Sequence, residues 1–181
     1  KKNKIALVSF YFLILLVIIA IFAPYLANDR PLYCEYEGNT LYPAFAEDTR
    51  TDSIFNSSGE FIKVLQYDIT DWRQLNLTKV VWAPIPYSPG SMDRYNRDYA
   101  SPGGKQRYKS PDGEILDIPN RFRHRLGTDG IGRDLASGLI HGTRISLMVG
   151  IVSMGIAALI GIILGALAVV GSSKINIIFS L

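Results

Sequence analysis

The stretch IALVSFYFLILLVIIAIF, residues 5–22, and the stretch ISLMVGIVSMGIAALIGIILGALAVV, residues 145–170, decide the fold class of this chain. Both are uncharged and almost entirely apolar. At about 1.5 Å of rise per residue, the second stretch would form a helix of about 39 Å, which exceeds the roughly 30 Å hydrocarbon core of a lipid bilayer. We therefore predict an α-helical membrane protein with two transmembrane helices.

The charged residues divide the chain by compartment. All 16 Asp and Glu lie between Asp29 and Asp134, whereas three lysines stand among the first four residues. Excess Lys and Arg beside a span stay on the cytoplasmic side, so both ends are predicted to be cytoplasmic and residues 23–144 extracytoplasmic. A cleaved signal peptide is the alternative for the first run, but neither Ala23 nor Ala27 makes a good cleavage site.

Between the spans the composition is that of a water-facing module. Fifteen of the twenty aromatic residues lie in residues 23–144, which indicates a packed core. We predict a β-rich extracytoplasmic insertion over residues 28–123. Its expected strands are 60–69 and 78–87, and the turn sequence SPDG, residues 110–113, predicts a hairpin between 105–109 and 114–118.

Several functional classes find no support in this module. Residues 23–144 carry 15 Lys and Arg against 16 acidic residues, so a basic face for nucleic acid is not expected. Two histidines and the single Cys34 make a poor metal set, and Cys34 is expected to be a half-buried small side chain without a disulfide. We therefore expect no metal. No phosphate-binding loop is present either, so we expect no cofactor.

The segment RLGTDGIGRDLASGLIHGTR, residues 125–144, is the most specific part of the chain. Thr128 or Asp129 is placed to cap a helix, and an apolar stripe follows along it. We predict an interfacial amphipathic helix over residues 124–144 that lies flat at the outer membrane surface.

Three polar residues of that helix invite a hydrolase interpretation. Asp134, Ser137 and His141 fall at i, i+3 and i+7 and would share one face. Catalytic triads usually draw their members from separate elements, whereas residues on one helical face all point outward. We therefore favour a solvated polar face and predict no catalytic residue.

The same segment resembles a known family. LGTDGIGRD at residues 126–134, LIHGTRISLMVGI at 139–151 and IFAPYLA at 21–27 are similar to the inner-membrane permease subunits of bacterial dipeptide/oligopeptide ABC importers, specifically the second permease of the pair. The motif residues expected at the outer interface are Leu126, Gly127, Thr128, Asp129, Gly132, Arg133 and Asp134.

The resemblance implies an α-helical permease of the bacterial inner membrane, of which this chain would be an N-terminal fragment. It also implies a partner permease, two cytoplasmic ATP-binding subunits that hydrolyse the ATP, and an extracytoplasmic peptide-binding protein. Two departures stand out. The family's coupling segment, rich in Glu-Ala-Ala, is absent, and residues 28–123 are longer than the usual connection. The expected divisions of the chain are 1–27, 28–123, 124–144, 145–171 and 172–181.

The second span carries a stripe of small residues, which recur every four positions: Ser153, Ala157, Gly161 and Gly165. Such a groove lets another helix approach closely, as the partner helices of a polytopic permease would. The alternative to transport is a two-span receptor whose outer lobe binds a ligand. Further spans beyond this sequence would indicate a permease, and a signalling helix with a soluble domain would indicate a receptor.

Overall fold

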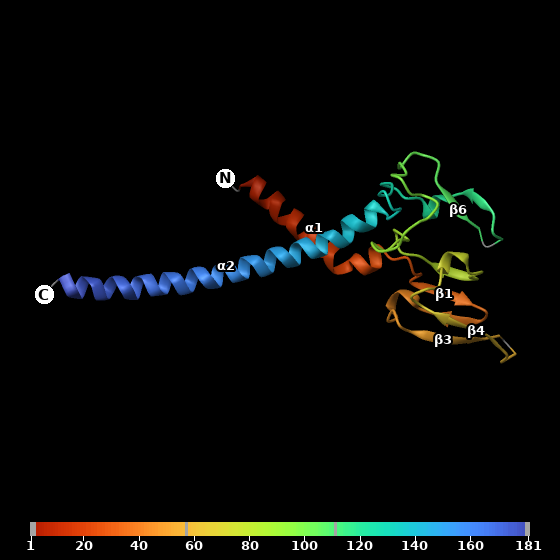
Figure 1. Cartoon of the computed structure of the whole chain (residues 1–181), viewed down its shortest axis with the longest axis horizontal. Helices are drawn as coiled ribbons and strands as arrows, with labels where there is room; N and C mark the ends of the chain where they lie inside the picture. The colour runs from red at the N-terminus through yellow and green to blue at the C-terminus, as the bar shows by residue number, and fades with distance from the viewer. Residues whose placement is uncertain (1–2, 57, 111, 180–181) are drawn as a thin grey trace. The chain divides into compact units, whose positions relative to one another are not determined.

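The computed structural model describes residues 3–56, 58–110 and 112–179, with side chains described through residue 168. The chain divides into two compact units, Lys1–Arg144 and Ile145–Leu181. Figure 1 traces the order of the elements, with helix α1 at the N-terminus, short strands in the middle and helix α2 at the C-terminus. The fold of the described residues is therefore mixed helix and sheet.

The two predicted apolar runs both lie in helices. Helix α1 is Lys4–Leu26 and helix α2 is Leu135–Phe179. Two described segments, Lys4–Leu26 and Leu135–Ala168, are long and apolar enough to cross a membrane, with mean hydropathies of 3.1 and 2.7. Their side chains are almost all exposed, which suits contact with lipid and does not suit a core helix of a water-soluble protein.

Between residues 33 and 117, the described part of the chain forms seven short strands in three antiparallel sheets. The first has the order β2-β1-β5, from β1 (Tyr33–Tyr36), β2 (Asn39–Leu41) and β5 (Lys79–Val81). The others pair β3 (Thr51–Phe55) with β4 (Phe61–Gln66) and β6 (Arg107–Lys109) with β7 (Ile115–Asp117). The described residues also form three 3-10 helices: η1 (Pro43–Phe45) after β2, η2 (Trp72–Gln74) after β4 and η3 (Asn120–Phe122) after β7.

The predicted strands are present in part. Strand β4 lies within the predicted 60–69, and β6 and β7 form the predicted hairpin. Only Lys79–Val81 of the predicted 78–87 is extended in a sheet. Pro84 and Pro86 follow it, and proline has no N–H to donate to a ladder.

One apolar core joins the first two sheets. Its buried members are Cys34, Tyr36, Leu41, Ile54, Leu65, Tyr67 and Trp72. The rings of Tyr67 and Trp72 meet edge to face at 5.0 Å between centroids. Cys34 is fully buried rather than half-buried, and burial raises the pKa of its thiol to about 11. The thiol is therefore protonated and unreactive at neutral pH.

The predicted helix over residues 124–144 is wrong in its first half. Residues 124–134 form turns, and helix α2 begins at Leu135. Gly127 and Gly132 have φ angles of 81° and 88°, which no α-helix contains. The helix N-terminus is capped by Asp134, whose Oδ1 accepts from the N–H of Ser137 at 2.7 Å. From Leu135 the helix runs without a break into the second apolar run.

Candidate functional site

Residues 124–134, called here the motif loop, pack against the segment 93–100. Thr128 makes the central contacts: its N–H donates to the carbonyl of Ala100 at 3.1 Å, and its hydroxyl donates to the carbonyl of Asn96 at 2.6 Å. The same hydroxyl oxygen accepts from the N–H of Ala100 at 3.0 Å. Further along, the N–H of Asp93 donates to the carbonyl of Gly132 at 2.8 Å. The two segments are thereby joined along their backbones.

The glycines of the motif loop permit this close approach. A Cβ on Gly127 would overlap the carbonyl oxygen of Ala100, and a Cβ on Gly132 would overlap that of Asp93. Both glycines also have positive φ angles, which side chains with a Cβ rarely adopt. The glycine spacing therefore follows from backbone contact with residues 93–100.

A buried histidine lies between two carboxylates behind this interface. His124 is fully buried; its Nδ1 lies 2.9 Å from Oδ2 of Asp134 and its Nε2 lies 3.2 Å from Oδ2 of Asp93. Gln106 fixes its backbone, accepting from the N–H at 2.8 Å and donating to the carbonyl at 3.1 Å. The ring of Tyr87 stacks on the imidazole at 4.0 Å between centroids. We call these residues the histidine cage.

The two carboxylates favour a charged imidazole. Burial disfavours charge on His124, but the hydrogen bonds to Asp134 and Asp93 outweigh it and raise the pKa of the imidazole. For Asp93, burial acts to raise the pKa, yet its contacts with His124, Asn96 and Tyr95 lower it overall. The histidine cage thus joins Asp93 and Asp134, the N-cap of α2, through ionic contacts with His124.

The structure separates the three residues of the hydrolase interpretation. Asp134 is 2% exposed and Ser137 fully buried, so the predicted solvated face is wrong for both. The carboxylate of Asp134 bonds His124, whereas Nε2 of His141 lies 2.9 Å from the carbonyl oxygen of Ala27 at the end of α1. Asp134 and His141 bond to different parts of the protein, the buried hydroxyl of Ser137 has no hydrogen-bond partner among the described residues, and the three do not form a triad.

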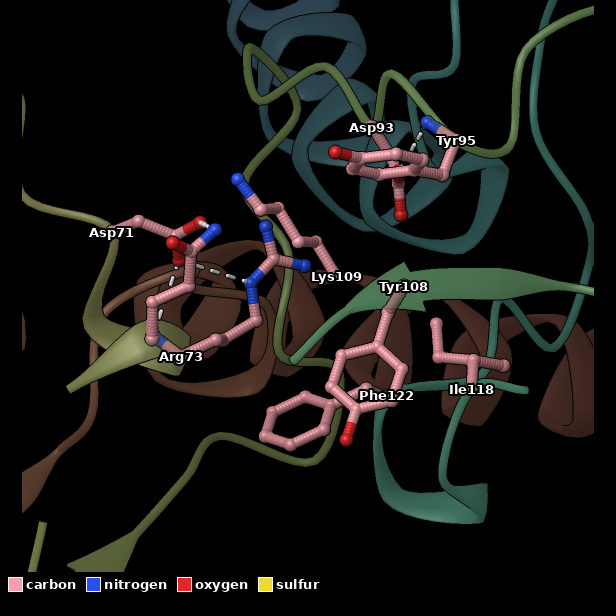
Figure 2. A pocket seen from close by; sticks show the side chains of 9 residues that line it. Asp71, Arg73, Asp93, Tyr95, Tyr108, Lys109, Ile118 and Phe122 are labelled. Atoms are coloured by element: carbon pink, nitrogen blue, oxygen red, sulfur yellow. Dashed lines mark hydrogen bonds and ion pairs between the residues drawn. The ribbon is translucent and has the colours of Figure 1, made fainter. Parts of the chain in front are cut away.

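A pocket of about 60 Å³ opens beside the histidine cage (Figure 2). Its walls include the rings of Tyr95, Tyr108 and Phe122. Arg73 lines it with its Nε 3.5 Å from Oδ1 of Asp71, and Asp93, which also lines it, is held by His124. Because the volume suits one side chain at most and these charges are already paired, we assign this pocket no ligand. No described group of three His, Cys, Asp or Glu is placed to hold a metal ion.

The remaining motif residues divide into inward and outward groups. Asp129 stabilises the loop itself, because its Oδ1 accepts from the N–H groups of Ile131 at 3.0 Å and Arg133 at 2.8 Å. Leu126, Ile131 and Arg133 have exposed side chains. Sequence reasoning assigned no role to Asp93 and counted His124 only in a poor metal set, since neither belongs to a recognisable motif.

The four small residues of α2 lie on its exposed surface. A Cβ added at Gly161 or Gly165 would have no atom within 4 Å, and Ser153 and Ala157 are exposed.

Comparison with known proteins agrees with the resemblance. Residues 1–43 match the N-terminal transmembrane domain of oligopeptide transport permease C. The inner membrane ABC transporter permease protein YejE of Escherichia coli K12 is 24% identical over 98% of this chain and 47% of its own length. The peptidoglycan transport system permease protein YejE of Agrobacterium fabrum is 27% identical over 92% of this chain and 45% of its own.

A shorter and closer match is to the di/tripeptide transport system permease protein DppC of Pseudomonas aeruginosa, 56% identical over 25% of this chain and 15% of the relative. No solved structure matches the chain. The chain spans about half the length of the curated relatives that match nearly all of it. With its two apolar helices it is a bacterial inner-membrane protein, and it is similar to the permease subunits of peptide ABC transporters.

Proposed function

We propose that this chain is part of a permease subunit of an ATP-driven peptide importer and forms part of the solute path together with a partner permease. The observation that carries the proposal is the similarity of nearly the whole chain to transporter permeases, combined with two helices of membrane-spanning length. In this proposal two separate ATP-binding subunits hydrolyse the ATP, and an extracytoplasmic binding protein delivers the solute.

The lobe between the spans points to a particular class of relative. Both YejE proteins align along more than nine-tenths of this chain, lobe included, whereas the DppC match covers 46 residues. We propose that the transported solute resembles those of the YejE permeases, one of which is named for peptidoglycan transport. Peptides or peptide-bearing wall fragments form that solute class.

We further propose that residues 28–123 form an extracytoplasmic β-rich insertion and that both ends of the chain are cytoplasmic, with 1–27 and 145–171 as the spans and 172–181 continuing inside. Three lysines among the first four residues, at the start of α1, support this orientation. The test uses a membrane-impermeant thiol reagent on intact cells, with Ser58→Cys and Ser173→Cys each in a Cys34→Ala background. Labelling at 58 and not at 173 is expected, and the reverse pattern would overturn the orientation.

The motif loop is proposed to present a contact surface at the outer mouth of the path. Its polar side chains Thr128, Asp129 and Asp134 are used within the fold, which leaves Arg133 as an exposed charge beside exposed apolar side chains. A guanidinium in that setting suits charge-assisted bonds to a partner permease or to a docked binding protein.

Uptake by the complete transporter in reconstituted vesicles tests this role. Arg133→Ala is expected to reduce uptake by about tenfold, the loss of one charge-assisted bond of about 1.5 kcal/mol, while the isolated ATP-binding subunits keep their activity. Arg125→Ala is the matched control, because Arg125 is an exposed arginine of the same loop outside the motif. Equal uptake by the two variants would refute the contact.

The stripe of small residues on α2 is proposed to pack against a helix of the partner permease; its members are Ser153, Ala157, Gly161 and Gly165.

A further inference from the structure

Exposed aromatic side chains of the lobe lie beside the end of helix α1. The ring of Phe45, in η1, packs on the ring of Tyr25 in the last turn of α1 at 5.5 Å between centroids. The neighbouring Tyr42 contacts Tyr33 edge to face at 5.6 Å. Phe45 is 58% exposed and Tyr42 is 55% exposed, although other aromatic residues of the lobe, such as Trp72, are buried.

The turn that carries these rings is held firmly to the chain that leaves α1. The N–H of Ala44 donates to the carbonyl of Pro31 at 3.1 Å. Arg30 forms an ion pair with Asp48 at 2.7 Å, and its guanidinium also reaches the carbonyl of Ala46 at 3.5 Å. These bonds join η1 and the residues just after it to Arg30 and Pro31, so the exposure of Phe45 and Tyr42 is a property of a fixed turn.

The position of Tyr25 sets the depth of the turn. Helix α1 is apolar to its end, and Asn28, Asp29 and Arg30 follow within four residues of Leu26. The boundary between hydrocarbon and headgroups therefore falls at the last turn of α1, where Tyr25 lies, and aromatic rings concentrate at this boundary. The ring of Phe45, which packs on Tyr25 at 5.5 Å between centroids, therefore lies close to the same depth.

We propose that Tyr42 and η1 form a membrane-contacting surface that seats the lobe on the leaflet where α1 ends, with Phe45 and Tyr42 at the headgroup–acyl boundary. The occupant of this surface is phospholipid. Continuity with the lipid-facing surface of α1 supports lipid over a protein partner, because Tyr25 belongs to both surfaces. The side chain of Asp48, 86% exposed, suits zwitterionic headgroups better than anionic ones.

The test measures the depth of a nitroxide label in the full-length protein, held in nanodiscs of phosphatidylcholine. Labels are attached at Phe45→Cys and Tyr42→Cys in a Cys34→Ala background, and collisions with oxygen and with a water-soluble nickel chelate are compared. Phe61→Cys is the matched control, because Phe61 is also 58% exposed but lies in β4 and packs on Phe55.

The expected result is that positions 45 and 42 collide mainly with oxygen, at a depth of about 5–10 Å below the headgroup surface, while position 61 collides mainly with the nickel chelate. If position 45 is as accessible to the chelate as position 61, the turn faces water and the proposal is wrong. If both reagents are excluded from position 45, a protein covers the turn, and the proposal is equally wrong.

Discussion

Replacing His124 by Phe tests the histidine cage most directly. Phe keeps a ring stacked on Tyr87 but leaves Asp93 and Asp134 without their charged partner. Each carboxylate loses a hydrogen bond to a charged group, worth about 1.5–3 kcal/mol, so the expected loss of unfolding free energy is about 3–6 kcal/mol. This agrees with the roughly 3–5 kcal/mol for breaking a buried ion pair, and it is a large part of the roughly 5–15 kcal/mol that stabilises a domain.

The assay is denaturant unfolding of the full chain in detergent micelles at neutral pH, followed by tryptophan fluorescence. Both tryptophans, Trp72 and Trp82, lie in the lobe, so the signal reports on the lobe and not on the spans. His141→Phe is the control, since His141 is half-buried and has one bond, to a carbonyl, worth about 1 kcal/mol.

Adding Asp93→Asn to His124→Phe should recover part of the loss, because one unpaired charge is removed. A loss for His124→Phe no larger than that of the control would show that the contacts of the cage are not ionic in the folded protein.

The other predictions concern pH, backbone and helix packing. The pKa of His124 is raised in the folded protein, so its charge contributes stability that is fully present below the unfolded pKa of about 6.5 and is lost as the pH rises through the folded pKa. The denaturant concentration at the unfolding midpoint should therefore fall as the pH rises through that range. It should not fall in His124→Phe, which lacks the titrating group. Gly132→Ala should cost about 1–3 kcal/mol from its positive φ alone, whereas Gly130→Ala, with ordinary contacts to a neighbouring ring, should cost little in the same unfolding assay. Gly161→Leu with Gly165→Leu should block close helix approach and so reduce co-purification of the partner permease with the full-length protein. An unchanged yield would mean that the stripe faces lipid.

Features with a local cause were predictable from the sequence. The two spans follow from composition alone, and the β6–β7 hairpin follows from the turn chemistry between its strands. The family motif was also recognisable, although its conformation was not. A stripe of apolar residues suggested a helix from Thr128, but Gly127 and Gly132 take φ angles that depend on contact with a distant segment.

Features with a distant cause were not predictable. Asp93 and His124 are 31 positions apart, and no spacing rule connects a single Asp to a single His. Strand β1 pairs with β5 through Glu35 and Lys79, which are 44 positions apart, so the first sheet could not be read from local patterns. The burial of Asp134 belongs to the same long-range packing, because its carboxylate bonds to the buried His124.

The histidine cage has a consequence for how the chain is made. Asp93 and His124 leave the ribosome before Asp134, which is the residue just before α2 and completes the cage. At a synthesis rate of about 5–20 residues per second, the stretch from Asp93 to Asp134 takes about 2–8 s, during which Asp93 waits without its final contacts. The histidine cage therefore closes only when the first residues of α2 begin to emerge, which couples completion of the cage to synthesis of α2.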